Sequence, residues 1–351
     1  MSASPARATA SAPASNIAGA PRSGVPGDVA GGGVAVGVAG GGVPGGASGG
    51  AVVSSAARLN PWRPLGPCSP AACVDVPVAA AGPVRRAARL SAALLVVVAG
   101  VPLSLAISWT RPARRARITR MWARLLLRAL GVRVAVAQGA AEGGGLVVAN
   151  HISWLDPLVI AATVPSRPLA KREIAGWPVI GRLVAGSGAL FIDRERLYAL
   201  PPTVAAVASA LRAGETVVAF PEGTTWCGRG MGRFRPAVFQ AAIDAGAPVL
   251  PATLRYGENG EISTRACYVG DDSLLASLLR VAATRHLAVE VTILPPVHPI
   301  PAGHRPEARA VLAMIAEARV RENLGAAGHF ARKGRRRPTP SSSEDAHPPG
   351  R

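Results

Sequence analysis

The stretch VVANHISWLDPLVI, residues 147–160, has two apolar halves separated by a turn that carries two ionisable residues. His151 follows the first apolar run directly, and Asp156 comes five residues later, just before Pro157. In a continuous α-helix these two positions point about 140° apart, so their side chains would not meet. They meet if a strand ends near Asn150 and a helix starts at Asp156, where Asp suits the N-cap and Pro the first turn. The stretch therefore predicts a strand, a turn and a helix.

The pairing of His151 with Asp156 predicts acid–base chemistry. A carboxylate that holds one imidazole nitrogen leaves the other nitrogen free to take a proton from a hydroxyl group. A structural interpretation is also open, in which Asp156 only caps the helix and His151 is a turn residue with a local hydrogen bond. The two are compatible, because the two carboxylate oxygens can serve different partners. His151 is therefore the candidate general base, and Asp156 its orienting partner.

Strand-like and helical segments alternate on both sides of this turn. Segments typical of strands are residues 131–137, 145–150, 167–172, 189–194, 216–221, 248–256 and 288–297. Helical patterns between them include residues 200–213, 236–246 and 305–323. Such alternation predicts an α/β fold in which a mixed sheet has flanking helices.

Two further strand-like segments end in cations. In open α/β sheets, ligands bind at the carboxyl ends of the strands. Lys171 follows RPLA and is one of only two lysines among 39 basic residues, so it stands out in a chain that otherwise uses Arg. Arg194 follows ALFID and can hold a phosphate through two parallel hydrogen bonds. The alternative for Arg194 is a surface ion pair with Asp193 or Glu195.

The turn FPEGTT, residues 220–225, follows another apolar segment. Here Glu222 can hold a substrate hydroxyl, Gly223 permits close approach of the backbone, and Thr224 offers a hydroxyl donor. Taken alone, such a sequence fits any turn. A general base beside a cationic pocket, however, indicates a hydroxyl nucleophile on a phosphorylated substrate.

The charge of the chain favours an anionic partner. The 351 residues carry a formal net charge of +19 and 49% hydrophobic residues. Such a balance is typical of proteins that bind nucleic acid, an anionic membrane or a phosphorylated substrate. Nucleic acid is the weaker possibility, because aromatic residues make up only 4% of the chain and no nucleic-acid motif appears.

The four cysteines are too few for a disulfide framework. Cys68 and Cys73 have C-x4-C spacing, but no second pair completes a metal site in the sequence. We therefore expect free thiols in a reducing compartment and no bound metal.

A membrane-anchoring segment is predicted over residues 90–130. Residues 90–109 carry no charge, and twenty helical residues match a bilayer core of about 30 Å. Residues 112–130 predict a basic amphipathic helix that suits an anionic membrane surface. Its expected apolar face consists of Ile118, Trp122, Leu125, Leu126 and Ala129, and its expected basic face consists of Arg117, Arg120, Arg124 and Arg128. More Arg follows the apolar run than precedes it, which places the rest of the chain at the cytoplasmic face of the plasma membrane. A buried core helix, a half-inserted hairpin and an interfacial helix are the alternatives for residues 90–109.

The remaining boundaries follow from composition. Gly, Ala, Ser and Pro dominate the N-terminal region, and the C-terminal tail is polar and basic, so neither can form a packed core. The predicted organisation is a disordered region 1–57, a linker 58–89, the membrane segment 90–130, a catalytic domain 131–325 and a disordered tail 326–351.

Four blocks of sequence, in this order and spacing, resemble those of the glycerolipid acyltransferases, and most closely the 1-acyl-glycerol-3-phosphate (lysophosphatidic acid) acyltransferase family. The blocks are NHISWLDP, GALFIDR, FPEGT and APVLP, and the resemblance covers roughly residues 115–300. It implies that His151 is the base and Asp156 its partner. It also implies that Arg194 and the turn of Glu222, Gly223 and Thr224 bind the glycerol phosphate, and that Lys171 helps to bind phosphate.

The resemblance implies a membrane-bound O-acyltransferase. The donor would be a thioester, acyl-CoA or acyl-carrier protein, and the acceptor the sn-2 hydroxyl of a lysophospholipid, giving phosphatidic acid. We expect membrane lipids as partners, no nucleic acid, and no metal or other cofactor. Two alternatives remain open: an acyltransferase for another lysolipid, such as a lyso-aminolipid, and a catalytically silent protein that binds anionic lipid. A thioesterase is less favoured, because water as acceptor requires no cationic pocket.

Overall fold

The computed structural model describes residues 66–77, 79–138, 143–193, 196–299 and 305–326, all of which belong to one compact unit, Ala57–Arg351. The region predicted to be disordered at 1–57 lies outside the described residues, and so does the C-terminal tail after Ala326.

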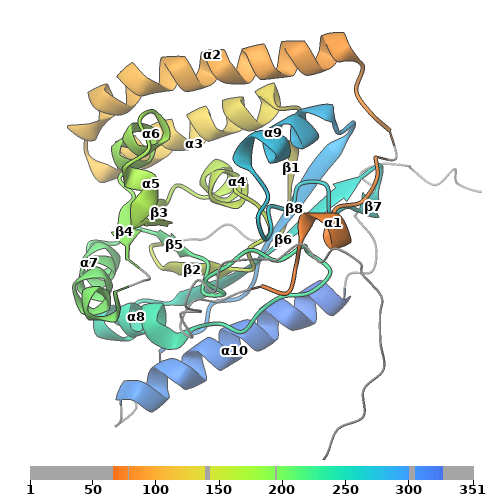
Figure 1. Ribbon diagram of the computed structural model, residues 1–351. Coiled ribbons are helices and arrows are strands. Elements are labelled where there is room, and N and C mark those ends of the chain that lie inside the picture. The colour runs from red at the N-terminus through yellow and green to blue at the C-terminus, as the bar shows by residue number, and fades with distance from the viewer. Residues whose placement is uncertain (1–65, 78, 139–142, 194–195, 300–304, 327–351) are drawn as a thin grey trace, which may run out of the picture. The chain divides into compact units, whose positions relative to one another are not determined.

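The described strands form one mixed sheet (Figure 1). They are β1 (Arg133–Gln138), β2 (Leu146–Ala149), β3 (Arg167–Lys171), β4 (Leu190–Ile192), β5 (Val217–Ala219), β6 (Val249–Glu258), β7 (Glu261–Ile262) and β8 (Leu287–Ile293). Their order is β1-β8-β6-β2-β5-β3-β4, with β7 paired to β6. Neighbours are parallel except for β6, which is antiparallel to β7 and β8. The mixed α/β sheet predicted from the sequence is therefore confirmed.

Helices lie on both faces of this sheet (Figure 1). The helices on one side, in the upper part of the figure, include α2 (Pro83–Ser108), α3 (Pro112–Ala129), α4 (Asp156–Thr163) and α9 (Leu274–Ala283). The helices on the other side are α7 (Leu200–Arg212), α8 (Phe239–Ala245) and α10 (Arg305–Ala326). The shorter helices are α1 (Pro70–Cys73), α5 (Arg172–Ala175) and α6 (Ile180–Gly186), with 3₁₀ turns at Leu197–Ala199 and Pro236–Val238.

Strand β2 shows how the sequence builds a core on each face. All four of its residues are buried, and successive side chains of a strand point to opposite faces. Val147 and Ala149 join the hydrophobic cluster under α3, α4 and α9, whereas Leu146 and Val148 join the cluster under α7, α8 and α10. A continuous apolar run is the pattern expected of a parallel strand covered on both faces. The end of β2, where His151 follows, is held firmly from both sides.

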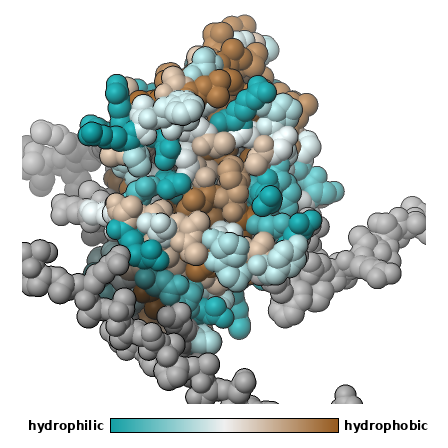
Figure 2. Space-filling model, turned by 90° about the vertical axis from the view of Figure 1, so that its left-hand side faces the viewer, coloured by the Kyte–Doolittle hydropathy of each residue, from teal (hydrophilic) through white to brown (hydrophobic). Residues whose placement is uncertain are grey.

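Helix α2 presents a long apolar surface. It begins at Pro83, earlier than the predicted residue 90, and contains an 18-residue window with a mean hydropathy of 2.4, of which only 22% is buried. Its exposed large side chains include Leu94, Leu95, Val98 and Leu105. Figure 2 shows apolar surface gathered at the top of the molecule, where α2 lies in Figure 1. This exposure argues against the buried-core alternative for the segment.

The inner side of α2 packs on α3. Gly100 allows the close approach, because a Cβ atom there would lie 2.6 Å from the indole nitrogen of Trp122. That nitrogen donates a hydrogen bond of 3.0 Å to the carbonyl oxygen of Val96. The two helices therefore form a packed hairpin in which α2 is the outer member.

The structure corrects two details of the helix predicted over residues 112–130. Leu125, assigned to the apolar face, is 54% exposed, whereas Leu127 is buried in its place. Arg120 and Arg124, assigned to the basic face, both donate to the carbonyl oxygen of Ala162 near the end of α4. Because uncapped carbonyls at a helix C-terminus attract cations, part of this basic face serves the fold itself.

Candidate active site

His151 and Asp156 meet at the end of β2, as the sequence predicts. The Nδ1 atom of His151 lies 2.8 Å from Oδ2 of Asp156, and the carboxylate is fully buried. The imidazole ring stacks on Phe220, with ring centroids 4.3 Å apart and planes inclined by 19°. Its side chain is 17% exposed. A ring held on one nitrogen and one face, yet open to solvent, has the arrangement of a general base.

Asp156 receives more donors than the histidine alone. The backbone N–H groups of Ile152 and Ser153 donate to Oδ2 over 2.5 and 2.8 Å. The hydroxyl of Tyr256 donates to Oδ1 over 2.7 Å. These contacts satisfy both carboxylate oxygens and fix the carboxylate beside the ring. A carboxylate in this position is suited to orient an imidazole that acts as a base.

The prediction that Asp156 is the N-cap of the helix is wrong. Helix α4 begins at Asp156, Leu155 precedes it as N-cap, and no side chain caps this end. The carboxylate points back into the turn, because three donors from the turn and one from β6 compete successfully for it. The turn is thus built around the Asp156 carboxylate.

Glu222 is buried beside this turn, and both of its carboxylate oxygens accept hydrogen bonds from the protein backbone. It is only 3% exposed. One carboxylate oxygen accepts from the backbone N–H of His151 over 2.8 Å, and the other accepts from Gly232 over 2.7 Å. Burial raises the pKa of Glu222 to about 8. This geometry favours a role in holding the His151 backbone, and direct contact of Glu222 with substrate stays a prediction.

Three other predicted binding residues, Lys171, Gly223 and Thr224, end or follow strands whose carboxyl ends lie along the same edge of the sheet, since β2, β5 and β3 are parallel neighbours. Lys171 ends β3 and is exposed. Two inter-strand spacings, about 10 Å, separate the ends of β2 and β3. Gly223 has a φ of 76°, a conformation that favours glycine, and Thr224 beside it is half-buried. Arg194 lies outside the described residues, just after β4.

A protein-family model described as Acyltransferase matches residues 131–255. Over 183 residues the chain is 39% identical to the 1-acyl-sn-glycerol-3-phosphate acyltransferase of Neisseria meningitidis, covering 51% of this chain and 71% of that protein. This chain belongs to the 1-acylglycerol-3-phosphate acyltransferase family of glycerolipid acyltransferases. The enzyme is therefore an acyltransferase of lipid metabolism.

Other relatives of this acyltransferase are named for a different acceptor. This chain is 35% identical over 187 residues to the lyso-ornithine lipid O-acyltransferase of Pseudomonas aeruginosa, covering 52% of this chain and 70% of that protein. It is 32% identical over 271 residues to the lyso-ornithine lipid O-acyltransferase of Rhodobacter capsulatus, covering 72% and 94%.

A solved structure shares the fold of this acyltransferase. The crystal structure of the 1-acyl-sn-glycerophosphate (LPA) acyltransferase from Thermotoga maritima superposes with a TM-score of 0.51 at 20% sequence identity. The match covers 69% of this chain and 94% of that one. At this identity the likeness supports the fold alone.

The sequence patterns did not identify two residues that are important to the site. Tyr256 lies 100 positions after Asp156, on β6, and is 2% exposed. Asn150 is buried, and its side chain pairs with the backbone N–H and carbonyl of Leu254 on β6. Both are polar residues within or beside apolar strands, and this feature could have marked them as candidates. No local pattern, however, predicts which residue each of them contacts. Both join β6 to the turn that carries His151.

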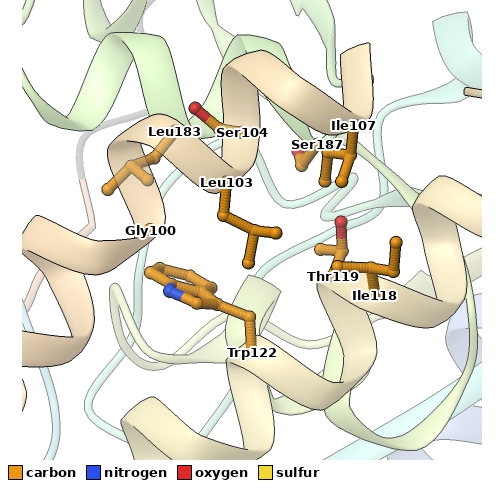
Figure 3. Close-up of a pocket in the computed structure, with 9 residues that line it drawn as sticks. All are labelled: Gly100, Leu103, Ser104, Ile107, Ile118, Thr119, Trp122, Leu183 and Ser187. Atoms are coloured by element: carbon orange, nitrogen blue, oxygen red, sulfur yellow. The ribbon is translucent and has the colours of Figure 1, made fainter. Parts of the chain in front are cut away.

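An apolar pocket lies away from this chemistry, between α2, α3 and α6 (Figure 3). Leu103, Ile118, Trp122 and Leu183 dominate its lining, and none of its nine lining residues is ionisable. The pocket therefore belongs to the packing of the helical hairpin and offers no group for acyl transfer.

Proposed function

We propose that this acyltransferase transfers a fatty acyl group from acyl-CoA or acyl-carrier protein to the sn-2 hydroxyl of 1-acyl-glycerol-3-phosphate, giving phosphatidic acid. The observation that carries the proposal is the 2.8 Å contact between His151 Nδ1 and the buried carboxylate of Asp156. The relative named for this substrate, at 39% identity, supports the choice of acceptor. A silent lipid-binding protein would have no use for such a pair, because Arg side chains alone bind anionic lipid.

In the proposed reaction, Nε2 of His151 takes the proton of the acceptor hydroxyl while the hydroxyl oxygen bonds to the thioester carbonyl carbon. Asp156 stabilises the imidazolium through Nδ1–H. Collapse of the tetrahedral intermediate breaks the C–S bond, and the proton passes from Nε2 to the departing thiolate. The sequence of steps forms no acyl-enzyme and uses no metal or prosthetic group.

The cationic edge of the sheet supports a phosphorylated acceptor. Lys171 lies at the end of β3, and Arg194 follows β4 along the chain. The ends of β2 and β3 are about 10 Å apart. A long Lys side chain from β3 and a glycerol phosphate together can span this distance to His151. We propose that Lys171 and Arg194 bind the phosphate of the acceptor, and that Gly223 and Thr224 contact its glycerol.

We place the reaction at the cytoplasmic face of the plasma membrane. The acceptor keeps one long acyl chain, so it stays in the bilayer and the active site must come to the surface. The exposed apolar side of α2 supports insertion into lipid. Three exposed Arg residues of α3, Arg114, Arg117 and Arg128, support contact with anionic headgroups.

A lyso-ornithine lipid is the second candidate acceptor. The Rhodobacter capsulatus relative named for this acceptor aligns over 94% of its length, which is the observation that favours a lyso-ornithine lipid. Its headgroup is an amino acid with a carboxylate and an amine, so it has no phosphate for the two cations.

The deciding experiment offers purified membranes of an expressing strain a labelled acyl-CoA with each of three acceptors: 1-acyl-glycerol-3-phosphate, a lyso-ornithine lipid and a neutral monoacylglycerol. Membranes with the His151→Ala variant provide the blank. We expect transfer to 1-acyl-glycerol-3-phosphate to be the fastest. Preferential transfer to the lyso-ornithine lipid would select the second candidate, and transfer to none above the blank would reject both.

A further inference from the structure

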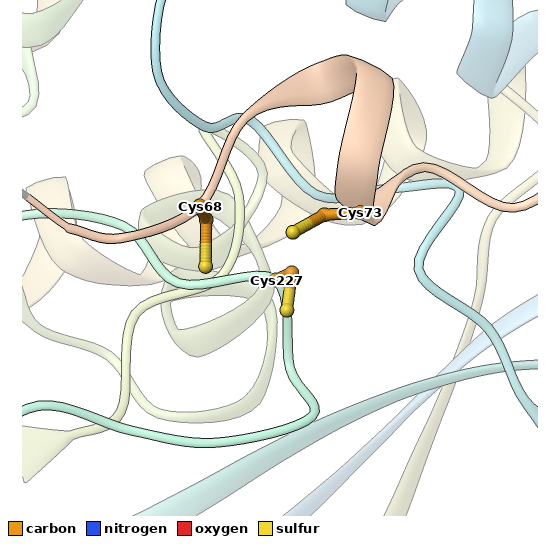
Figure 4. Close-up of side chains that lie close together, drawn as sticks. All are labelled: Cys68, Cys73 and Cys227. Atoms are coloured by element: carbon orange, nitrogen blue, oxygen red, sulfur yellow. The ribbon is translucent and has the colours of Figure 1, made fainter.

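Three cysteines that are far apart in the sequence lie together (Figure 4). Cys68 precedes α1, Cys73 is its last residue, and Cys227 follows the FPEGTTW turn near the active site. Their Sγ atoms all lie within 4.8 Å of one another. Figure 4 shows Cys73 reaching from α1 toward the other two, which come from separate segments. The structure thus supplies the third thiol that the C-x4-C spacing alone lacks.

The distances suit a shared cation. Zinc–thiolate bonds of about 2.3 Å place neighbouring sulfurs of a tetrahedral site about 3.8 Å apart. A disulfide requires a separation of about 2.05 Å between only two sulfurs. All three cysteines are free thiols in the structure. Contraction of about 1 Å is the most that the widest pair needs in order to bind one ion.

The cluster is largely withdrawn from solvent. Cys68 and Cys227 are buried and Cys73 is half-buried, so dissolved reactants have little access to the thiols. A thiol that coordinates a cation gives up its proton to the solvent.

The fourth cysteine of the chain, Cys267, is also a buried free thiol, but it lies outside this cluster of three. The proposed acyl-transfer mechanism uses none of these thiols. Three of the four cysteines of the 351-residue chain therefore lie in one cluster that has no other assigned role.

We propose that Cys68, Cys73 and Cys227 bind one thiophilic divalent cation of the Zn²⁺ class, with a water molecule in the fourth position. Thiolate ligands select such soft cations over Mg²⁺ or Ca²⁺. The proposed site is structural, because its three protein ligands are all cysteines and none of them belongs to the proposed acyl-transfer mechanism.

The proposed site would clamp the segment around α1 onto the active-site loop. The two already touch, because a Cβ atom at Gly66 would lie 3.2 Å from the carbonyl oxygen of Thr225. The next residue in the loop, Trp226, donates its backbone N–H to the carbonyl oxygen of His151 over 2.8 Å. A cation at Cys227 therefore fixes the chain one residue from a direct contact with the catalytic histidine.

The test measures metal in the purified full chain, prepared in detergent without a metal-chelating tag. We expect about one zinc per chain in the wild type, and less than about a tenth of that in Cys68→Ser and in Cys227→Ser. Ala72→Ser is the matched control, since it adds the same hydroxyl at an exposed position of α1. It should keep the full zinc content.

A second measurement removes the dependence on variants that fail to fold. Wild-type protein is stripped with a chelator, loaded with Co²⁺ and examined for thiolate-to-cobalt charge-transfer absorption in the near ultraviolet. We expect this band, and we expect added Zn²⁺ to abolish it. An active wild-type enzyme with four titratable thiols, no zinc and no cobalt band would overturn the proposal. So would a protein with only two titratable thiols before reduction, since a disulfide would then occupy the cluster.

Discussion

At the scale of single residues, Asp156 organises the site. It is fully buried and accepts hydrogen bonds from the His151 ring, from two N–H groups of its own turn and from Tyr256. One residue thereby fixes both the backbone of the turn and the orientation of the base. Such a residue tolerates little change, because each donor it serves would otherwise be buried without a partner.

Tyr256 should act as a positioning residue through Asp156. We expect Tyr256→Phe to lower turnover about tenfold, equivalent to about 1.4 kcal/mol, because it removes one charge-assisted hydrogen bond and keeps the ring. With one donor fewer, more of the Asp156 charge acts on the imidazolium, so the acid limb of the pH–rate profile should move to higher pH. Rate profiles of the wild type and the variant check this. A variant that is merely less stable, with an unmoved profile, would refute the positioning role.

Glu222 should make stability depend on pH. Burial raises its pKa in the folded protein to about 8, from an ordinary value of 4.5. Its contribution to stability is therefore complete below 4.5 and is lost as the pH rises through 8. Glu222→Gln cannot lose a proton, so we expect the Tm of the wild type, relative to the variant, to fall between about pH 5 and about pH 9. Thermal unfolding in detergent measures both. A Tm difference that is constant over this range would contradict the assignment.

At the scale of elements, α2 combines two surfaces with different tasks. One side meets α3 closely at Gly100 and Trp122, and the other exposes a row of large apolar residues. Because one side packs on α3, α2 lies along the surface of the domain. Because the other side also consists of apolar residues, the whole helix is apolar in sequence. The helix extends back to Pro83 because Arg86 and Arg89 find acceptors in backbone carbonyls.

The exposed side of α2 should anchor the protein in the membrane. Leu94 and Val98 are 63% and 59% exposed, so a charge at either leaves the fold intact. An Asp near the middle of an inserted helix costs about 2.5 to 3.5 kcal/mol. We expect the double variant Leu94→Asp/Val98→Asp to wash from membranes in high salt, where the wild type stays.

Val84→Asp is the matched control for the anchor. Val84 is 82% exposed but lies in the first turn of α2, where an acidic residue is favourable and the bilayer core is not reached. It should behave as the wild type does. Release of the wild type by the same salt wash would show that α2 is no anchor.

Lys171, at the end of β3, should affect binding of the acceptor more than binding of the acyl donor. If Lys171 binds the phosphate, Lys171→Ala should raise the KM for 1-acyl-glycerol-3-phosphate about tenfold or more, because a charge-assisted hydrogen bond is worth about 1.5 to 3 kcal/mol. The KM for acyl-CoA should change little, and Lys171→Arg should restore part of the loss. Equal changes in both KM values would assign Lys171 a purely structural part.

At the scale of the whole molecule, local patterns in the sequence predicted most elements and both members of the proposed catalytic pair, His151 and Asp156. The strands are short apolar segments bounded by turns, and such segments can be recognised in the sequence. Because β2, β3 and β5 are parallel, His151, Lys171 and Glu222 lie at the carboxyl-end edge of the sheet. What escaped prediction is non-local. Tyr256 and Cys227 meet their partners only through the order of strands in the sheet, which no short pattern encodes.

The wrong assignment of Asp156 as a helix cap has the same origin. Propensity compares a residue with its neighbours along the chain, and by that comparison Asp before Pro is a good cap. In the folded protein, Tyr256 and the His151 ring offer stronger partners on the other side. Tertiary contacts therefore override a local preference at the very place where the chemistry is expected.

The central claim is that His151, held by Asp156, deprotonates the acceptor hydroxyl. Its most direct test is the turnover of His151→Ala with labelled acyl-CoA and 1-acyl-glycerol-3-phosphate, compared with wild type at equal amounts of folded, membrane-located protein. We predict a loss of about 10² to 10⁴-fold, the usual contribution of a general base. Turnover equal to that of the wild type in a well-folded His151→Ala variant would contradict the account.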